Sequence, residues 1–364
     1  MAITAYFDLE AYQFDVINAF LNAPLKQKIW IKYPPGFRVS QKVLLVHRAL
    51  YGLRISPLLW YELLCATMKK LGLKPVPECA CLFTNSQLIV FFYVDNIVIL
   101  FHKSNKGLYE EFRTNLMGEF KLREISQLKW FLGIRVLQDR IHHKLWLCQD
   151  SYITKIAKTF NLQYQKARTP MSTNLLMPYK GQSTKYDTHR YQRKVGSIAY
   201  LASTTRPDCS RALQKLSEFL QNPSPDHEAA ADQCIAYAYT TRSYALEYSS
   251  SDIQPVFQVA SDASFADESE RRWSTEGGIF KLFGGCIDWF CTLQRTVTTS
   301  STEAELLALS HICAWLFWWR RVFEQLELDL DSESTVHCDN LQTVQLIIKD
   351  TPKLVTKLKH INIH

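Results

Sequence analysis

The sequence lacks the signals by which several large classes of protein are recognised. It contains ten cysteines but no Cys-x-x-Cys pair, the spacing found in many zinc and redox sites. Most of the cysteines have apolar neighbours, as in Leu147-Cys148. We therefore predict reduced, buried thiols of an intracellular protein rather than disulfides.

Signals for membranes and for targeting are also missing. The apolar run at 88–101 is too short to cross a membrane and has Asp95 and Asn96 at its centre. A second apolar run, from Leu306 to Trp319, is interrupted by a serine and a histidine. No basic-then-apolar leader, repeat or low-complexity tract is seen. We expect no targeting signal and no membrane partner.

The chain does have the composition of a folded protein with more than one domain. Its 364 residues predict two or three domains, and 47% apolar residues are enough to form their cores. Charge is uneven, because residues 1–253 carry a net charge of +12 and residues 254–364 a net charge of −5. The basic part could favour a polyanion such as a nucleic acid.

Local patterns in the basic part predict short strands followed by helices. Residues 12–17 read as a strand that ends near Asp15, and 88–101 as two strands around a tight turn at Val94-Asp95-Asn96. Residues 56–72 read as a helix with Ser56 as its N-cap. Further elements are expected as a strand at 29–33, helices at 104–120, 150–161, 191–221 and 226–241, and a strand pair at 130–137 and 145–148.

A different pattern begins near residue 254. Three strands are expected near 256–261, 277–283 and 286–291, with Gly284-Gly285 as a hairpin signal. A long helix at 302–326, capped by Ser301 or Thr302 with Glu305 in a capping-box position, precedes a strand at 334–338 and a helix at 341–349. The order predicts two α+β domains with a boundary near 249–255.

Two carboxylates stand at unusual places in this pattern. Asp15 ends an apolar strand, and Asp95 lies in a turn between two strands that are otherwise wholly apolar. A charge in such surroundings is unfavourable unless it is solvated, paired or bound to a metal. One reading is a polar turn that caps a buried hairpin, and the other is a metal site.

Several ordered motifs resemble the copia-type retrotransposon polyprotein. In the first part these are FDVINAFLNAPL (14–25), LYGLRISPLLWY (50–61), YVDN (93–96) and FLGIRV (131–136). Further along they are YITKIAKTF, TPMST, VGSIAYL, TRPD, SEFLQNPSPDH, SDASFADE, GGCIDWF, SSTEAE, CDN and KHINI. The resemblance covers nearly the whole chain and favours the metal reading. It implies a reverse transcriptase palm and thumb in residues 1–250 and an RNase H-like mixed-sheet domain in residues 254–364.

The resemblance assigns roles in the first domain residue by residue. Asp15 and Asp95 resemble the palm carboxylates that hold two Mg²⁺ ions for phosphoryl transfer. Phe20 corresponds to the aromatic under the incoming sugar, and Gly52 to a point of close backbone approach to the nucleotide. The primer grip maps to Phe131, Leu132 and Gly133. Phe20 and the primer-grip residues also fit an alternative reading as ordinary core residues.

In the second domain, the family's RNase H carboxylates map to Asp262, Glu305 and Asp339, with the fourth at position 362. Glu303 is a rival to Glu305, but residues two apart on a helix cannot face the same site. The alternative reading of the three acids is solvated surface charge.

The chain departs from the family in both metal sites. Asn96 stands where the family has the second aspartate of Tyr-Val-Asp-Asp, and Asn362 stands where it has the fourth RNase H aspartate. An amide keeps one oxygen and loses the negative charge, so we interpret the two changes as decay of the element. We also expect the family's fingers to be missing ahead of Asp15 and the RNase H domain to be truncated after residue 364.

The resemblance implies an RNA-directed DNA polymerase with an RNase H domain and impaired polymerase activity. Implied partners are an RNA template, a DNA primer, dNTPs and RNA–DNA hybrid, with two Mg²⁺ ions in each active site, or Mn²⁺ in their place. Virus-like particles in the cytoplasm are the implied location. The alternatives are a catalytically inactive nucleic-acid-binding remnant and an unfolded product of a broken reading frame. Whether the chain is active and which oligomer it forms are left open by the sequence.

Overall fold

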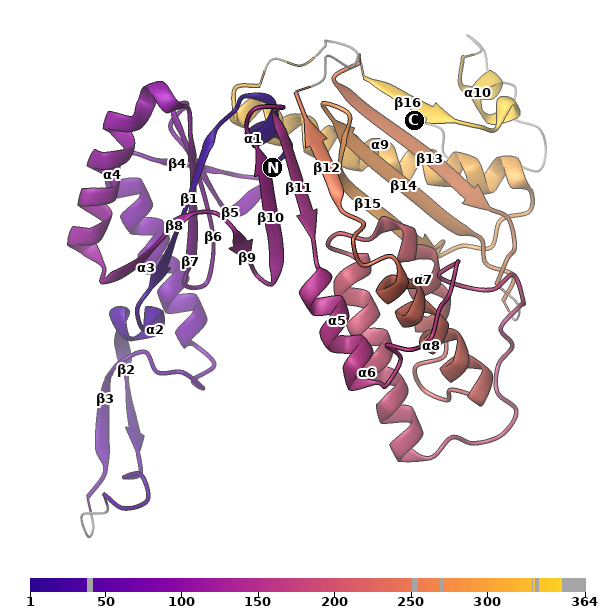
Figure 1. Cartoon of the computed structure of the whole chain (residues 1–364), viewed down its shortest axis with the longest axis horizontal. Coiled ribbons are helices and arrows are strands. Elements are labelled where there is room, and N and C mark those ends of the chain that lie inside the picture. The colour runs from indigo at the N-terminus through magenta and orange to yellow at the C-terminus, as the bar shows by residue number, and fades with distance from the viewer. Residues whose placement is uncertain (38–41, 251–254, 269–270, 329, 331–333, 349–364) are drawn as a thin grey trace. The chain divides into compact units, whose positions relative to one another are not determined.

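A computed structural model describes residues 1–37, 42–250, 255–268, 271–328, 330 and 334–348 (Figure 1). The chain forms two compact units. The six-stranded unit comprises Phe7–Leu128 and the described residues from Arg320 to Leu328. The larger unit comprises Met1–Tyr6, Lys129–Trp319 and the described residues from Leu330 onward. Helices, antiparallel sheets and one mixed sheet confirm the predicted α+β class.

The six-stranded unit is built on an antiparallel sheet in the order β4-β5-β6-β7-β1-β8. Its strands are β1 (Glu10–Val16), β4 (Lys74–Val76), β5 (Cys79–Thr84), β6 (Leu88–Tyr93), β7 (Asn96–Phe101) and β8 (Leu122–Gln127). The predicted strands at 12–17 and 88–101 are therefore confirmed. β1 lies between β7 and β8, so its polar end is held on both sides.

Two helices cover one face of this sheet. α3 (Ser56–Lys70) and α4 (Lys106–Glu119) contribute Trp60, Leu64 and Leu116, all at most 2% exposed, to a core with strand residues such as Phe14 and Ile99. The 3₁₀ turn η1 (Lys103–Asn105) leads into α4. Side chains alternate between the two faces of a strand, so Phe14 lies on the same side of β1 as Tyr12 and Val16, and all three contribute to this core.

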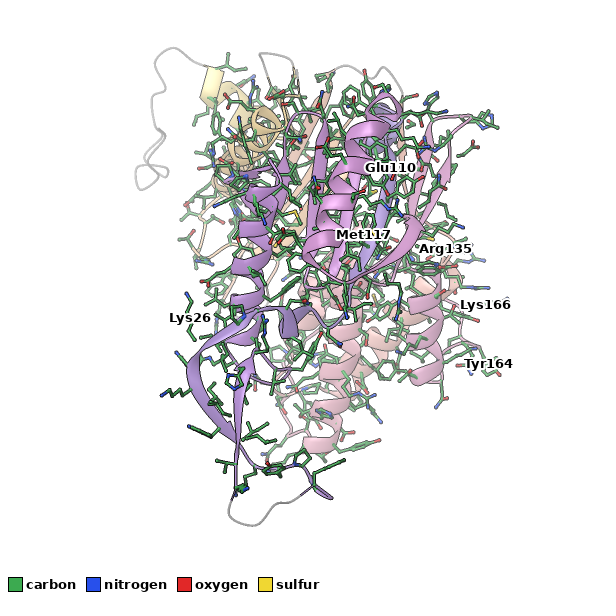
Figure 2. All side chains as sticks on the ribbon, turned by 90° about the vertical axis from the view of Figure 1, so that its left-hand side faces the viewer. Lys26, Glu110, Met117, Arg135, Tyr164 and Lys166 are labelled. Carbon is green, nitrogen blue, oxygen red and sulfur yellow. The ribbon has the colours of Figure 1, made fainter. Side chains whose placement is uncertain are left out.

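A separate two-stranded ribbon follows the short helix α2 (Ala19–Asn22). It pairs β2 (Pro24–Ile31) with β3 (Leu44–Arg48), and it extends from the body of the unit in Figure 1. Lys26 lies on β2 and points outward, and Met117 lies on the outer side of α4 (Figure 2). The strand predicted at 29–33 is confirmed but begins earlier, at Pro24.

The start of α3 differs from the prediction. Ile55, not Ser56, is the N-cap, and the Ser56 hydroxyl donates to the carbonyl oxygen of Leu50 at 2.6 Å. The hydroxyl is therefore used to close the preceding loop, which turns at Gly52 with φ +95°. Pro57 lies in the first turn and Gly72, at φ +84°, follows the helix end as expected.

The larger unit begins with α1 (Ala2–Tyr6) and contains a helical part and two sheets (Figure 1). The helices are α5 (Asp150–Thr159), α6 (Lys185–Ala202), α7 (Ser210–Ser217), which follows the 3₁₀ turn η2 (Pro207–Cys209), and α8 (Pro225–Thr240). They share a core that includes Ile153, Ile198, Leu216 and Ile235. Beside them, a sheet in the order β12-β11-β10-β9 pairs β9 (Trp130–Phe131), β10 (Ile134–Asp139), β11 (Lys144–Cys148) and β12 (Leu246–Ser249).

The second sheet of the larger unit is mixed. Its order is β15-β14-β13-β16, and β13 pairs antiparallel with β14 and parallel with β16. The strands are β13 (Phe257–Ser264), β14 (Thr275–Leu282), β15 (Gly285–Leu293) and β16 (Thr335–Cys338), followed by α10 (Leu341–Ile348). The hairpin turn lies one residue earlier than predicted, at Phe283-Gly284, and both residues have positive φ, as a two-residue hairpin of this kind requires.

The long helix α9 (Ser301–Gln325) also begins differently from the prediction. The Ser300 hydroxyl accepts from the backbone N–H of Glu303 at 3.2 Å, so Ser300 is the capping side chain. Glu303 accepts from the backbone N–H of Thr299 at 2.6 Å, so Glu303 and not Glu305 binds a backbone donor at the helix start. Glu305 is thereby free for another role.

Ionic contacts join the helical part of the larger unit to its mixed sheet. Arg211 on α7 pairs with Asp267, which follows β13, and donates to the Thr275 hydroxyl at 2.8 Å. The indole N–H of Trp289 on β15 donates to the carbonyl oxygen of Ala202 at 2.7 Å. Residues on both sides of the predicted boundary near 249–255 thus belong to one compact unit, while the domain boundary itself stays a prediction.

A buried arginine ties the helices together. Arg206, 1% exposed, donates to both carboxylate oxygens of Asp208 and to the Thr241 hydroxyl at 2.6 Å. Its guanidinium also lies over the rings of Tyr237 and Tyr244, 5.3 and 5.6 Å from their centroids. These contacts need a planar group whose donors are held in a fixed fork, and the compact ammonium of lysine lacks that geometry.

We therefore predict that Arg206→Lys lowers the free energy of unfolding by roughly 1–3 kcal/mol, because a buried ammonium cannot make the bidentate pair with Asp208 together with the bond to Thr241. Urea unfolding of the full chain, followed by tryptophan fluorescence, measures the change. Arg242→Lys is the matched control, since Arg242 is exposed and stacks on Tyr239 at 4.7 Å. Equal effects of the two substitutions would show that the Arg206 network contributes no special stability.

Candidate metal centres

Asp15 and Asp95 come together through strand pairing in the six-stranded unit. Asp15 is the register partner of Asn96 across β1 and β7. The backbone N–H of Val16 donates to the carbonyl oxygen of Asp95 at 2.8 Å, which fixes the turn against the end of β1. Both aspartates are half-buried. The structure thus places the two predicted palm carboxylates at one end of the sheet, and their catalytic role stays a prediction.

The turn that carries Asp95 is strained, and a hydrogen bond from Trp60 on α3 stabilises it. Tyr93 pairs with Asn96, so Val94 and Asp95 alone form the turn, and Val94 has φ +55°. A β-branched residue in that region costs on the order of 1–3 kcal/mol. The indole N–H of Trp60, which is 2% exposed, donates to the carbonyl oxygen of Val94 at 2.6 Å and offsets part of this cost. Strain of this kind is common at functional sites.

Asn96 is engaged in hydrogen bonds on both sides of its amide. Its oxygen accepts from the Gln13 side-chain amide at 2.8 Å, and its nitrogen donates to a carboxylate oxygen of Asp95 at 3.1 Å. An aspartate at this position could not donate to Asp95. Carboxylate oxygens are the donors that Mg²⁺ prefers, so Asp15 and Asp95 fit one such ion. Asn96 supplies no negative charge for a second ion, and its oxygen already accepts the hydrogen bond from Gln13.

Phe20, Tyr51 and Gly52 lie in the same unit as these carboxylates. Phe20 is half-buried and packs against the core, with its ring 4.5 Å from that of Tyr51. Gly52 has φ +95°, a conformation that a side chain would strain. Tyr51 was not predicted. Partial burial, and then the negative charges of Asp95 and Asp15, raise the pKa of its hydroxyl above the ordinary value. Its phenol is thus within electrostatic reach of both carboxylates.

The predicted primer-grip residues lie in the larger unit. Phe131 ends β9, and Leu132 and Gly133 form a two-residue turn, at φ +51° and +79°, before β10. The Tyr200 hydroxyl on α6 donates to the carbonyl oxygen of Leu132. Phe131 is half-buried and Leu132 is 38% exposed, so these residues form a surface turn rather than a core. Their proposed contact with a primer stays a prediction.

Glu305 and Asp339 meet at the end of the mixed sheet. Glu305 lies on α9 and accepts from the backbone N–H of Ala263, on β13, at 3.3 Å. Asp339 follows β16, which is parallel to β13 with Cys338 beside Ser261. A carboxylate oxygen from each acid and the Cys338 sulfur all lie within 4.8 Å of one another. Asp262 is exposed on β13 and is not among these three ligand atoms in the described part of the chain.

The electrostatics of Glu305 are unusual. The residue is 5% exposed, and its second oxygen, Oε2, has no hydrogen-bond partner in the described residues. Burial first, and then the charges of Asp339 and Asp262, raise the pKa of Glu305 to about 7, although the N–H of Ala263 opposes the shift. A buried carboxylate oxygen without a donor fits a cation. The preference for Glu305 over Glu303 agrees with the geometry, since Glu303 caps the helix.

Cys338 is a neighbour of this site that we did not predict. Burial raises the pKa of its thiol, and the charges of Glu305, Asp339 and Asp262 raise it further. All ten cysteines are free, but only Cys148, Cys209 and Cys234 are fully buried, so the prediction of buried thiols is only partly confirmed. Asn362 lies outside the described residues.

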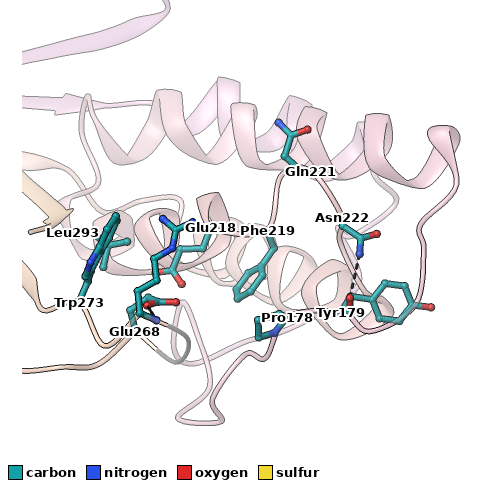
Figure 3. A pocket seen from close by; sticks show the side chains of 10 residues that line it. Pro178, Tyr179, Glu218, Phe219, Gln221, Asn222, Glu268, Trp273 and Leu293 are labelled. Carbon is teal, nitrogen blue, oxygen red and sulfur yellow. Dashed lines mark hydrogen bonds between the residues drawn. The ribbon is translucent and has the colours of Figure 1, made fainter. Parts of the chain in front are cut away.

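A pocket elsewhere in the larger unit contains none of the predicted site residues. It has a volume of about 310 Å³ and is lined by residues that include Glu218, Phe219 and Trp273 (Figure 3). The Asn222 amide donates to the carbonyl oxygen of Tyr179 at its edge at 3.1 Å. The predicted site residues therefore lie at the sheet ends and not in this pocket.

Comparison with known proteins agrees with the motifs. A family model described as "Reverse transcriptase (RNA-dependent DNA polymerase)" matches residues 1–173. The chain is 30% identical over 361 residues to a retrovirus-related Pol polyprotein from transposon TNT 1-94 of Nicotiana tabacum, covering 95% of this chain and 27% of that polyprotein. It is 29% identical over 357 residues to the Pol polyprotein from transposon RE2 of Arabidopsis thaliana, covering 96% of this chain and 24% of that polyprotein.

A shorter relative is matched almost completely. The putative transposon Ty5-1 protein of Saccharomyces cerevisiae is 29% identical over 305 residues, which are 81% of this chain and 98% of the yeast protein. The chain spans about a quarter of the length of the plant polyproteins. Among the described residues, no helix combines the length and the apolar character that a membrane crossing needs.

The raised pKa of Glu305 predicts how stability depends on pH without metal. The folded state holds this proton more tightly than the unfolded state does. The resulting stability is therefore present below the unfolded pKa of 4.5 and is lost as pH rises through about 7. We predict that Glu305→Gln stabilises the metal-free chain at about pH 8, by at most roughly 3 kcal/mol, and has little effect at about pH 4. Chemical unfolding in chelator-treated buffer at the two pH values measures this difference.

Glu324→Gln is the control, because Glu324 is exposed on the same helix and its substitution should not depend on pH in this way. Destabilisation by Glu305→Gln at both pH values would mean that the ionised carboxylate is well accommodated without a cation.

Proposed function

Because the chain belongs to the copia/Ty1-type retrotransposon Pol region and carries its reverse transcriptase domain, we propose that it is a polymerase with an impaired palm site and a more intact RNase H site. In this proposal the larger unit combines a thumb with an RNase H-like domain. The substrates are an RNA template, a DNA primer and dNTPs for synthesis, and RNA–DNA hybrid for cleavage. The polymerase and RNase H activities of whole Pol proteins are part of the proposal.

The observation that carries the proposal is the buried, unpartnered Oε2 of Glu305 beside Asp339. In this site, Glu305 and Asp339 would hold divalent ions, with Asp262 beside them and position 362 as an outer donor. When bound, such ions polarise the phosphate and activate the attacking water. Without a cation the three carboxylates would repel the phosphates of the hybrid, so their role in this proposal is to hold the ions.

In the palm, Asp15 and Asp95 would hold one ion. Phe20, backed by Tyr51, presents a flat surface on which the sugar of the incoming nucleotide can rest, and the backbone at Gly52 leaves room for the nucleotide. Basic residues supply the affinity for nucleic acid, since residues 1–253 carry a net charge of +12. The negative second part binds hybrid poorly by itself.

The second candidate is a nucleic-acid-binding remnant without catalysis. The hydrogen bond from Asn96 to Asp95 favours this candidate for the palm, because it occupies a carboxylate oxygen that a metal ion would otherwise use. In that case the chain binds hybrid in a salt-dependent manner, and no variant with a restored charge catalyses primer extension or hybrid cleavage.

We predict that Asn96→Asp raises Mg²⁺-dependent primer extension at least about tenfold over a very weak wild-type rate, because it restores a charge at the metal site. Extension of a labelled primer on an RNA template measures the rate. Asn174→Asp, on an exposed loop, adds the same charge far along the chain and serves as the control. Robust extension by the unmodified chain would refute the proposal of an impaired palm.

We predict weak cleavage of labelled RNA–DNA hybrid by the full chain, with a preference for Mn²⁺, whose geometric demands we take to be looser than those of Mg²⁺. Asp262→Asn should lower the rate roughly 100-fold or more, and Asn362→Asp should raise it. Residues 254–364 alone should cleave less than the full chain. Activity that survives Asp262→Asn would end this part of the proposal.

A further inference from the structure

The Cys338 thiol lies at the same sheet end as the two acids. Its sulfur and one carboxylate oxygen each from Glu305 and Asp339 all lie within 4.8 Å of one another. The donors of a tetrahedral zinc ion lie about 2.0–2.3 Å from the ion and therefore about 3.5 Å from one another. Side-chain rotations that draw the three atoms together by about 1 Å would therefore let all of them contact one ion.

Two unsatisfied polar groups indicate that this place accepts a ligand. Glu305 is 5% exposed and its Oε2 has no hydrogen-bond partner among the described residues. The Ser261 hydroxyl, on a residue also 5% exposed, is likewise without a partner in the described part of the chain. Ser261 is the register partner of Cys338 in the parallel pair of β13 and β16, so the two side chains share a face of the sheet.

The donor set is mixed in its chemistry. Two carboxylates suit hard ions such as Mg²⁺, which take oxygen ligands. A thiolate is a soft donor and selects ions such as Zn²⁺ and Cd²⁺. A site with both kinds of donor discriminates poorly between the two classes of ion, and the ion with affinity for sulfur gains a ligand that Mg²⁺ does not use.

We propose that Glu305, Cys338 and Asp339 bind one thiophilic divalent cation of the zinc class, and that this ion excludes Mg²⁺ and stops RNA cleavage. Binding exchanges the thiol proton for the metal ion and releases that proton to solvent. Formation of the site depends only on the three donors. The inhibition rests on the RNase H activity proposed above, so the two parts have separate tests.

Cadmium itself is the probe for binding. Cd²⁺ is titrated into the full reduced chain, and the thiolate-to-cadmium charge-transfer absorption in the ultraviolet reports sulfur ligation. Cys338→Ser should weaken the tightest binding at least about tenfold, which is the loss expected even for outer-shell partners of a metal site. Cys313→Ser is the matched control, because Cys313 is a half-buried thiol on α9 outside the cluster. Glu305→Gln should also weaken this tightest binding of Cd²⁺.

Equal titrations for the wild type, Cys338→Ser and Cys313→Ser would overturn the site. The inhibition is tested by hybrid cleavage in Mg²⁺, and for each variant the rate with Cd²⁺ is divided by the rate without Cd²⁺. This ratio should fall well below one for the wild type and for Cys313→Ser and stay near one for Cys338→Ser. Equal inhibition of Cys338→Ser refutes the regulatory part. If no variant cleaves hybrid but the Cys338-dependent band is present, the proposed RNase H function fails and the metal site stands.

Discussion

Carboxyl groups held against the apolar ends of β-sheets are the constraint on which both candidate sites depend. In the six-stranded unit, β7 runs through fully buried residues from Ile97 to Ile99 directly after Asp95 and Asn96. In the larger unit, Glu305 is itself buried against β13. A charge in such a place raises the free energy of the fold unless a donor or cation compensates it. The two sites meet this demand in different ways.

The palm compensates its charge internally. Asn96 donates to Asp95, Gln13 donates to Asn96, and the turn is held by Trp60. The network stabilises the metal-free hairpin at the expense of oxygens that a pair of Mg²⁺ ions would need. The site around Glu305 has no such substitute in the described residues, because Oε2 remains unpartnered. The charge of one site is thus offset by protein groups, while the other leaves an oxygen open to a ligand.

Local patterns predicted much of the fold but not all of the sites. The hairpin at 88–101 was predictable because two apolar runs flank polar turn residues. Ser56 was misassigned as a capping residue because its hydroxyl instead binds Leu50 in the preceding loop. Glu305 was misassigned because the capping serine of α9 is Ser300, one residue earlier than expected. Cys338 was missed because its proximity to Glu305 arises from the parallel pairing of β13 with β16, which no local pattern encodes. Tyr51 stands in the motif at 50–61, but the sequence does not show that its ring packs on Phe20.

We infer that carboxyl groups at the ends of the two sheets hold divalent cations, weakly at Asp15 and Asp95 and more tightly at Glu305 on α9. Titration of Mn²⁺ into the full chain, followed by loss of the free-ion signal in electron paramagnetic resonance, measures both classes of site. We expect a tighter class of bound ions that is lost in Glu305→Gln and a weaker class that is lost in Asp15→Asn. Manganese binding that is absent, or that neither substitution changes, would show that these groups do not hold cations.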